Sequence, residues 1–256
     1  MWANHLIAFD RVSKTFMTKN GENQAVDDIS LTVDEGEFVS ILGPSGCGKS
    51  TLLSMLSGLF QPTKGKVFVN NESVTKPRKD IGYMLQQDYL LSWRTIRQNI
   101  LLGLEIQNAL TSETERHALR LLAEMGLLSY KDHYPHQLSG GMRQRVALVR
   151  TLATNPQILL LDEPFSALDF QTKLRLEDLV ADTLKRKKKT AILVTHDISE
   201  AVAMSDRIFV LKSSPGKIAT TIEIPDSLRE PLPFASRDVP DFQHYFQLVW
   251  KELNTK

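Results

Sequence analysis

The N-terminal part of the chain alternates between hydrophobic and polar positions, as β-strands do. This pattern predicts strands at "LIAFDRV", "ISLTV" (Ile29–Val33) and "GKVFVN". The segment "EFVSIL" (Glu37–Leu42) predicts a buried strand. Asp34-Glu35-Gly36 supplies a turn between the second and third strands. The segment "KSTLLSMLSGL", between the third and fourth strands, has a helical pattern, and we expect Gly58 to end that helix.

The middle of the chain is helical and is followed by two strands of almost continuous apolar residues. The periodicity from Ile96 to Met125 predicts helices, and Ser112 and Glu115 have the spacing of a capping box before "HALRLLAEMGL". "QILLLDEP" (Gln157–Pro164) and "KTAILVTHD" are typical of strands buried on both faces of a parallel sheet. Strands alternating with helices predict an α/β fold, with an inserted helical lobe near residues 96–155.

The chain changes character after Ser213. "PDSLREPLPFASRDVPDF" holds several prolines and few periodic positions. The final segment "DFQHYFQLVWKEL" predicts an amphipathic helix whose apolar positions are Phe242, Tyr245, Phe246, Val249 and Trp250. We expect this helix to dock on the domain, and a helix that binds a partner is the alternative.

Composition narrows the possible classes of protein. A chain of 256 residues with 42% hydrophobic positions is long enough for one large domain with a sizeable core. The 31 Lys and Arg residues balance 30 Asp and Glu residues, so charge gives no reason to expect a nucleic-acid partner. No apolar run approaches the roughly 18 residues of a membrane span, and the start "MWANHLIAFDRV" lacks a secretory pattern. The single Cys47 excludes an internal disulfide and fits a reducing cytosol, so we expect a cytoplasmic protein.

One charged run, Lys185-Arg186-Lys187-Lys188-Lys189, ends a predicted helix. Cations suit the negative end of the helix dipole, so a solvated helix end explains the run. Attraction to anionic lipid headgroups is the alternative.

The segment "GPSGCGKST" matches the P-loop pattern and lies between a strand and a helix, as a P-loop does. Glycines let backbone N–H groups converge on phosphates, and the helix N-terminus adds partial positive charge. Lys49 reaches the β- and γ-phosphates, and the Ser50 hydroxyl can bind Mg²⁺. Cys47 lies near Lys49 and a helix N-terminus, which favours a reactive thiolate, with an inert small residue as the alternative. The predicted nucleotide-binding residues are Gly43, Pro44, Ser45, Gly46, Cys47, Gly48, Lys49, Ser50 and Thr51.

Three further side chains follow the two buried strands. Asp162, at the end of its strand, can hold Mg²⁺ through water, and Glu163 beside it can activate the attacking water as a general base. Two carboxylates that merely cap a strand are the alternative. His196 follows "AILVT", where a strand-end histidine would face the γ-phosphate, although a lone histidine is more often structural.

A second glycine-rich segment at the start of a predicted helix is "QLSGGMRQRVALVR" (Gln137–Arg150). Such helix starts can bind phosphate, which raises the question of why one domain needs two of them. The P-loop, "LSGGMRQR", "LLLDEPFSALD" and "VTHD" occur in the order and approximate spacing of ATP-binding cassette (ABC) ATPases. From about Leu6 to Gly216 the chain resembles the ATPase subunits of bacterial importers for nitrate, sulfonates, taurine and thiamine precursors. "SGGMRQR", "PFSALD" and "SDRIFVL" are typical of that branch.

The resemblance implies a fold and a set of site residues. The fold is a P-loop NTPase core with a mostly parallel central sheet, an antiparallel β subdomain and an inserted α-helical subdomain. We expect a single domain over 1–256, with the helical subdomain at about 90–155 and a C-terminal tail at about 214–256. Catalysis falls to Glu163, the switch histidine His196 and the Q-loop glutamine Gln86, which is preferred over its neighbour Gln87 and also contacts Mg²⁺. The remaining positions are the adenine-stacking Phe16 (a core Phe is the alternative), the signature residues Ser139, Gly140 and Gly141, and the D-loop Asp169.

The same resemblance implies a function. The cofactors are ATP and Mg²⁺, and two copies pair head-to-tail so that each signature loop closes over the partner's P-loop. The homodimer drives a separate membrane permease served by an extracytoplasmic solute-binding protein, from the cytoplasmic face of the membrane. We expect Leu90, Leu91 and Trp93 to face the permease, with packing inside the helical lobe as the alternative.

Three other classes of cassette protein stay open. They are a soluble ATPase of DNA repair or translation, an exporter subunit, and a nucleotide-binding regulator. Long coiled coils, tandem cassettes and fused membrane spans, which mark several of these, are not seen in the sequence. Related importers often have Leu-Pro-Trp where this chain has Leu91-Ser92-Trp93, and loss of the proline should loosen that turn.

Overall fold

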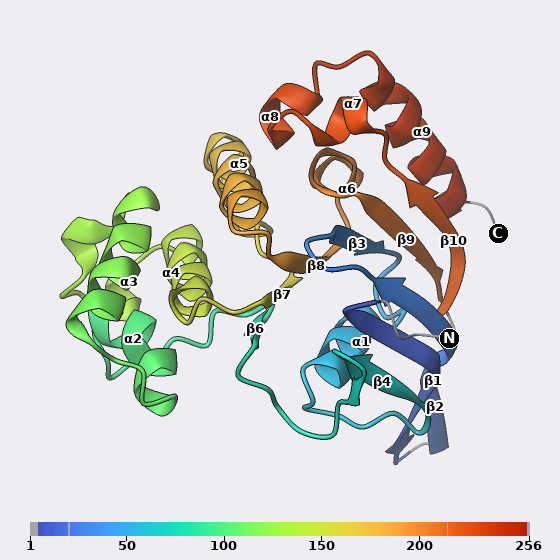
Figure 1. The fold of residues 1–256 in the computed structure, drawn as a ribbon, viewed down its shortest axis with the longest axis horizontal. Helices are drawn as coiled ribbons and strands as arrows, with labels where there is room; N and C mark the ends of the chain where they lie inside the picture. Colours follow the sequence, from blue (N-terminus) through green and yellow to red (C-terminus); the bar gives the residue numbers. More distant parts are fainter. Residues whose placement is uncertain (1–4, 20, 214, 255–256) are drawn as a thin grey trace. The chain divides into compact units, whose positions relative to one another are not determined.

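The computed structural model describes residues 5–19, 21–213 and 215–254. The chain divides into two compact units, one made of Met1–Arg78 with Glu177–Lys256 and the other of Lys79–Leu176 (Figure 1). Helix α5 (Phe170–Arg186) begins in the second unit and continues into the first. No helix among the described residues is long and apolar enough to cross a membrane.

The first unit contains an antiparallel sheet in the order β2-β1-β4-β5. Its strands are β1 (Ile7–Thr18), β2 (Gly21–Val33), β4 (Lys64–Val69) and β5 (Glu72–Ser73). Ile7 pairs with Val33 of β2 on one side and with Val69 of β4 on the other, and all three side chains are fully buried. This register places the apolar residues of the predicted strands on one inner face.

The same unit contains a second sheet that carries the P-loop. Strand β3 (Phe38–Leu42) runs parallel to β8 (Thr190–Thr195) and β9 (Arg207–Lys212), and β10 (Lys217–Glu223) pairs antiparallel with β9. Every residue of β3 and β8 is buried, as the sequence predicted for both strands. Helix α1 (Lys49–Leu56) follows β3 and ends before Gly58, which adopts a φ of 78°. A residue in this left-handed conformation ends a helix with little cost when it is glycine.

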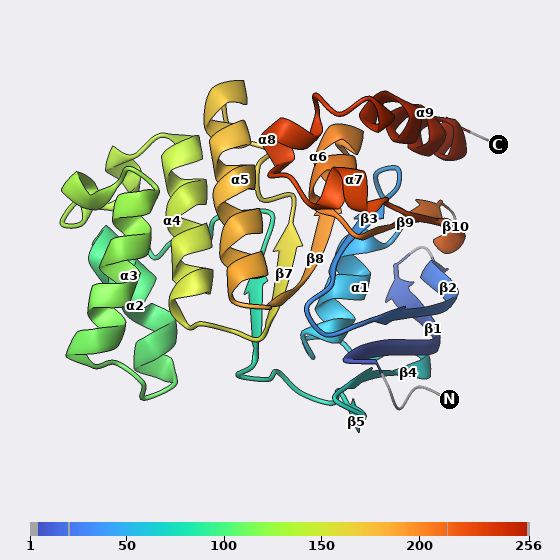
Figure 2. The same ribbon diagram turned by 45° about the horizontal axis from the view of Figure 1, so that its top comes forward.

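The C-terminal segment packs on the first unit through helices α7 (Asp226–Arg229), α8 (Pro233–Ser236) and α9 (Asp241–Asn254). Figures 1 and 2 show α9 beside α6 (Ile198–Met204). Phe242 and Val249 are buried, which favours the prediction that this helix docks on its own domain. Trp250, on the same helix, is 58% exposed and does not join that contact.

A buried ion pair anchors this segment to α5. The guanidinium of Arg237 donates to Glu177 Oε2 at 2.6 Å, to Ser199 Oγ at 3.0 Å and to Pro233 O at 2.7 Å. The Glu177 side chain is fully buried, and burial of a carboxylate is costly unless a cation such as Arg237 pairs with it.

The second unit consists of a parallel strand pair and a helical group. Strand β6 (Ile81–Met84) pairs with β7 (Ile158–Asp162), whose residues are all buried. Helices α2 (Ile96–Ile106), α3 (Ser112–Glu124) and α4 (Gly140–Ala153) lie side by side in both views (Figures 1 and 2). Two short 3₁₀ turns, Leu128–Tyr130 and Pro135–Gln137, connect α3 to α4. The helical periodicity from Ile96 onward predicted this group.

The fold corrects some local predictions. The capping box of α3 is formed by Thr111 and Thr114 rather than by Ser112 and Glu115, because the Thr111 side chain accepts from the Thr114 N–H and the Thr114 side chain from the Thr111 N–H. Strand β1 continues to Thr18, well beyond the predicted "LIAFDRV". The predicted boundaries of the helical subdomain and of the C-terminal tail stay predictions. Residue 214, where the tail is predicted to start, and residues 1–4 and 255–256 at the ends of the predicted domain lie outside the described residues.

Candidate functional site

The P-loop residues of the first unit form the turn between β3 and α1. Gly46 and Gly48 adopt φ angles of 80° and 92°, a left-handed conformation that glycine adopts without strain. A Cβ on Gly48 would lie 2.3 Å from Val26 Cγ1 and 2.9 Å from Ala25 O, so this position also has no room for a side chain. Backbone conformation and space therefore both require glycine at Gly48.

Lys49 is held inside this loop. Its side chain is buried, and its Nζ donates to the carbonyl oxygens of Gly43 at 2.8 Å and Pro44 at 2.9 Å. Pro44, Ser45 and Gly46 are exposed at the rim. An ammonium group held behind exposed backbone at the start of a helix fits the binding of phosphate groups.

The prediction of a reactive Cys47 thiolate is wrong. Cys47 is fully buried, and burial raises the pKa of its thiol despite the opposing charge of Lys49, whose Nζ lies 3.8 Å from the sulfur. Removal from water disfavours the thiolate more than one nearby cation favours it. The neutral thiol packs beside Gly43, where a Cβ would lie 2.6 Å from Cys47 Sγ.

Phe16, the predicted adenine-stacking residue, lies on β1 and is half-buried. Its ring meets the ring of Phe60 edge-on with centroids 5.8 Å apart, and Lys14 Nζ lies 5.1 Å from the Phe16 centroid. A half-buried ring beside a cation provides an apolar face for a purine, which fits the predicted role better than a place in the core.

His196, the predicted switch histidine, follows β8 in the first unit and is exposed. The next residue, Asp197, caps α6 by accepting hydrogen bonds from the backbone N–H groups of Ser199 at 2.7 Å and Glu200 at 3.3 Å. Strand and cap together fix the backbone on both sides of His196.

The second unit brings Gln86 and Glu163 together. Gln86 Nε2 donates to Glu163 Oε2 at 3.0 Å. Glu163 follows β7 and adopts a φ of 49°, which a residue other than glycine adopts only when its surroundings hold it there. Strained backbone of this kind is frequent at functional sites, and here it carries the predicted general base.

Asp162 ends β7 and is 4% exposed, and Tyr83 Oη lies 3.5 Å from its Oδ2. No group of three or more His, Cys, Asp or Glu side chains among the described residues forms a metal cluster. Mg²⁺ in nucleotide sites is held by one or two protein oxygens together with substrate phosphates and water. The Asp162 carboxylate and the exposed Ser50 hydroxyl therefore have the donor chemistry that Mg²⁺ requires.

The predicted signature residues form the start of α4. Ser139 is the N-cap, and its Oγ accepts from the Met142 N–H at 3.3 Å. Ser139 and Gly140 are exposed, so the positive end of a 14-residue helix faces solvent. A Cβ on Gly141 would lie 3.1 Å from Ala167 O, so the helix start packs closely on the segment after Glu163.

Asp169 lies in this segment and is exposed. Its Oδ1 accepts from the Thr172 N–H at 3.0 Å in the first turn of α5. Hydrogen bonds from Thr172 hold the pKa of this carboxyl below its ordinary value. Asp169 therefore stays ionised while it caps the helix.

Sequence reasoning missed two buried polar residues in the second unit, Asn99 and Gln144. Asn99 Oδ1 accepts from the Leu91 N–H at 2.8 Å, and its Nδ2 lies within hydrogen-bond distance of three carbonyl oxygens, those of Leu91, Arg94 and Thr95. Asn99 therefore holds Leu91 at both its N–H and its carbonyl oxygen, which is a support for the Leu91-Ser92-Trp93 turn that does not need a proline; the predicted loosening of this turn stays a prediction. A polar residue at an apolar position of the helical pattern was the available signal.

The predicted permease-facing residues differ in exposure. Trp93 is 72% exposed, whereas Leu90 and Leu91 are half-buried. Tyr89, which was not predicted, is 59% exposed beside them. The aromatic side chains of this segment are thus the ones available to a partner.

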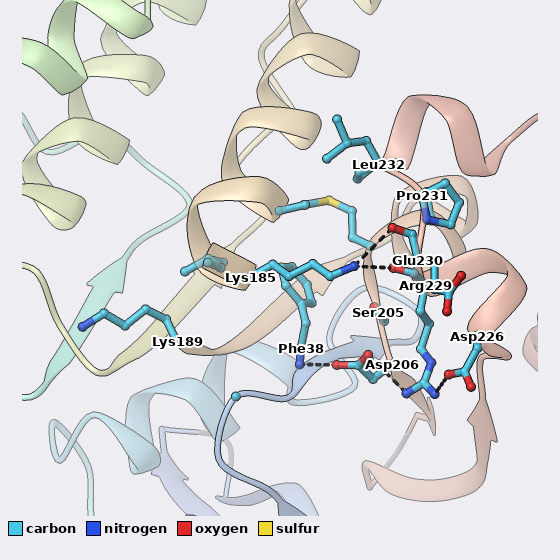
Figure 3. A pocket seen from close by; sticks show the side chains of 16 residues that line it. Phe38, Lys185, Lys189, Ser205, Asp206, Asp226, Arg229, Glu230, Pro231 and Leu232 are labelled. Carbon is cyan, nitrogen blue, oxygen red and sulfur yellow. Dashed lines mark hydrogen bonds and ion pairs between the residues drawn. The ribbon is translucent and has the colours of Figure 1, made fainter. Parts of the chain in front are cut away.

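A cavity of about 350 Å³ in the first unit contains none of the predicted site residues. Figure 3 shows Lys185 reaching from α5 to the carbonyl oxygens of Arg229 and Glu230, at 3.4 and 3.1 Å. Arg229 in turn pairs with Asp206 and Asp226 (Figure 3). Lys185, the first residue of the basic run, therefore binds the C-terminal segment. The predicted explanation of the run as a solvated helix end does not account for Lys185.

Comparison with known proteins identifies the family. The family model "ABC transporter" matches residues 26–166. An uncharacterized ABC transporter ATP-binding protein of Bacillus subtilis strain 168, YtlC, is 54% identical over 96% of this chain and 95% of its own length. The nitrate import ATP-binding protein NrtD of Synechocystis is 41% identical over 86% of this chain and 84% of its own. The aliphatic sulfonates import ATP-binding protein SsuB of Bacillus subtilis strain 168 is 40% identical over 94% and 91%.

Solved structures agree with this result. The ATP-binding cassette MJ0796, solved as a dimer in a post-hydrolysis state with ADP and Pi, superposes with a TM-score of 0.78. Its sequence is 35% identical, and the match covers 86% of this chain and 99% of that one. The chain thus has the fold of an ABC ATPase cassette and belongs to the ABC transporter ATP-binding family. It is an ATPase that couples hydrolysis to transport.

Proposed function

We propose that this chain is the ATPase subunit of an importer for small oxyanions or sulfonates, of the nitrate, sulfonate and taurine type. The names of relatives at 38–41% identity support the direction and class of transport. The subunit acts as a homodimer at the cytoplasmic face of the membrane, bound to a separate permease that receives solute from an extracytoplasmic binding protein. Trp93 and Tyr89, exposed after the Q-loop, supply apolar contact area for the permease.

The observation that supports the dimer is the presence of two glycine-rich helix starts in one chain, at α1 and at α4. Pro44, Ser45 and Gly46 of the P-loop are exposed, and so are Ser139 and Gly140 at the start of α4. A P-loop encloses its nucleotide from one side, so the second helix start serves the ATP of the partner. The dimeric form of the cassette MJ0796 supports this arrangement.

The residues then have distinct tasks in hydrolysis. Lys49 and the N–H groups of Ser45–Thr51 bind the phosphates, and Phe16 stacks on the adenine. Ser50, Asp162 and Gln86 would hold Mg²⁺, which would neutralise phosphate charge. Glu163 takes the proton of the attacking water, and the hydrogen bond from Gln86 fixes its carboxylate. His196 contacts the γ-phosphate, and Asp169 lies at the dimer contact.

Glu163→Gln tests the catalytic role and the dimer together. The amide cannot accept the proton, so we expect hydrolysis to fall by roughly 10²- to 10⁴-fold while ATP binding persists. The stalled subunit should elute as a dimer with ATP in size-exclusion chromatography. Glu113→Gln, which removes the same charge from an exposed position on α3, is the control. Near-normal turnover, or only monomer with ATP, would contradict the proposal.

Reconstitution tests the direction of transport. The subunit is expressed with a candidate permease, and its ATPase is assayed in proteoliposomes with the binding protein loaded with nitrate, a sulfonate or taurine. We expect stimulation by one loaded binding protein. Stimulation by DNA or RNA would indicate a repair or translation ATPase. Outward transport that needs no binding protein would indicate an exporter.

A further inference from the structure

Gln144 lies in the second turn of α4, three residues after Gly141, and its side chain is 5% exposed. A buried side-chain amide needs partners for both its donor and its acceptor. None of the catalytic or nucleotide-binding tasks described above uses this residue.

The partners of Gln144 all lie in the segment that begins with Glu163. Its Nε2 donates to Glu163 O at 3.0 Å and lies 3.4 Å from Ser166 Oγ. Its Oε1 accepts from the Ala167 N–H at 3.0 Å. The amide therefore binds the backbone of this segment at two points, which only a side chain with both a donor and an acceptor can do.

The segment that Gln144 binds, Glu163–Ala167, begins with a strained backbone conformation. Glu163 adopts a φ of 49°, and its carbonyl oxygen also accepts from Ser166 Oγ at 3.0 Å. A strained backbone persists only when neighbouring groups fix it. Gln86 holds the carboxylate of Glu163 at 3.0 Å, and Gln144 holds its backbone. Together they fix the direction in which the carboxylate points.

The same residue ties this segment to the signature loop. Ser139 and Gly140 start α4, and Gly141 packs on Ala167 so closely that a Cβ would lie 3.1 Å from Ala167 O. Gln144 and Gly141 thus fasten one helix start to one catalytic loop at two neighbouring points. Movement of the helix start must carry the Glu163–Ala167 segment with it.

We propose that Gln144 is a positioning residue that fixes the carboxylate of Glu163 relative to the signature helix. The proposal rests on the catalytic role proposed for Glu163 and on the shared-site dimer. When the start of α4 binds the partner's ATP, Gln144 transmits its position to Glu163. Glu163 thereby reaches its working position when the dimer closes.

Gln144→Glu is the sharpest test because it keeps size and shape. The carboxylate still accepts from the Ala167 N–H, but it cannot donate to Glu163 O and repels it. We expect kcat to fall by about 10²-fold, as a misplacement of about 1 Å can cause. KM and the affinity for ATP should change less than about threefold, because the hydrogen bonds of Gln144 go to Glu163, Ser166 and Ala167.

Two further variants keep the test decisive. Gln144→Met has similar length and tolerates burial without charge, and it should lower kcat in the same way if Gln144→Glu folds poorly. Thr151→Val is the matched control, since Thr151 is a buried residue of α4 whose hydroxyl donates to Ala147 O of the same helix, at 3.0 Å, and to no residue of the catalytic segment among those that the structure describes. We expect Thr151→Val to keep wild-type kcat and KM. Equal losses in Thr151→Val and Gln144→Met would overturn the proposal.

A double-mutant cycle separates positioning from general support. If Gln144 acts through Glu163, Gln144→Met should add almost nothing to the loss already caused by Glu163→Gln. A further 10²-fold loss in the double variant would show that Gln144 acts elsewhere. A different result contradicts the proposed function: wild-type turnover in Glu163→Gln alone would show that Glu163 is not the general base. If Glu163→Gln is inactive but both Gln144 variants keep wild-type kcat, only the positioning role is wrong.

Discussion

Gly216 lies against the backbone of Cys47 in the P-loop, so Gly216→Ala tests how much the P-loop depends on this close approach. The N–H of Gly216 donates to Ala25 O at 3.0 Å, and its carbonyl oxygen accepts from the Asp27 N–H at 2.9 Å. An added Cβ would lie 2.0 Å from Cys47 O and 3.1 Å from Ala25 O. Ordinary contacts between such atoms need about 3.5 Å, so the backbone at Cys47 must move by more than about 1 Å.

The displaced carbonyl belongs to the loop whose N–H groups bind phosphate. A misplacement of about 1 Å at a reacting centre can cost about 10²-fold in rate, so we expect Gly216→Ala to lower hydrolysis by that factor and to weaken ATP binding. Overpacking should also lower the free energy of unfolding by about 1–3 kcal/mol. The assays are steady-state hydrolysis, titration with a fluorescent ATP analogue, and urea denaturation.

Gly103→Ala supplies the control for this experiment. A Cβ on Gly103 would lie 2.6 Å from Thr154 Cγ2, a side-chain methyl of the residue that follows α4, which is not part of the P-loop. We expect this variant to bind and hydrolyse ATP normally. If Gly216→Ala retains wild-type ATP affinity and turnover, Gly216 does not support the P-loop and the reasoning is refuted.

Three other predictions test particular contacts. The raised pKa of the buried Cys47 thiol should keep maleimide labelling of the native protein slow at neutral pH; the thiol's contribution to stability should be complete below its ordinary pKa of 9.0 and be lost as pH rises toward the raised value. Rapid labelling at pH 7 would contradict this. Arg237→Ala leaves the Glu177 carboxylate buried without its cation, so the free energy of unfolding in urea should fall by about 3–5 kcal/mol; a change below about 1 kcal/mol would refute the anchoring role. Asn99→Ala should cost about 1–3 kcal/mol and make the turn after Leu91 more sensitive to protease, and unchanged cleavage would contradict the role of Asn99.

Local sequence patterns predicted the features of the fold that depend only on residues close together in the chain. The almost continuous apolar runs of β7 and β8 predicted buried strands without any knowledge of their neighbours, because strands of a parallel sheet are covered on both faces. Gly43–Ser50 matches a motif whose geometry is local, and its helix begins at Lys49 as the motif requires.

The sequence did not reveal features that depend on distant segments. Cys47 has Lys49 and a helix start beside it, yet the burial of its side chain in the folded domain raises the pKa of its thiol. Gln144 looked like one more polar residue of a helix, and its partners at Glu163 and Ala167 follow β7. The capping box of α3 was ambiguous locally, since Thr111 with Thr114 and Ser112 with Glu115 have similar spacing. The hydroxyl of Thr114, which also donates to Ala109 O at 2.9 Å, decides between them.

The central claim is that each ATP is held by the P-loop of one subunit and the signature loop of the other. Ser139→Arg places a bulky side chain at the exposed start of α4, and Lys49→Ala removes the ammonium from the P-loop. Each variant alone should be nearly inactive, while isolated Ser139→Arg should bind ATP like the wild type.

Mixing the two variants gives the most direct measurement. A mixed dimer has one site with an intact P-loop and an intact signature loop, and a second site in which both are altered. We expect the mixture to hydrolyse ATP well above the level of either variant alone. An ATPase rate in the mixture no higher than the mean of the two variants, together with loss of ATP binding by Ser139→Arg alone, would contradict shared sites.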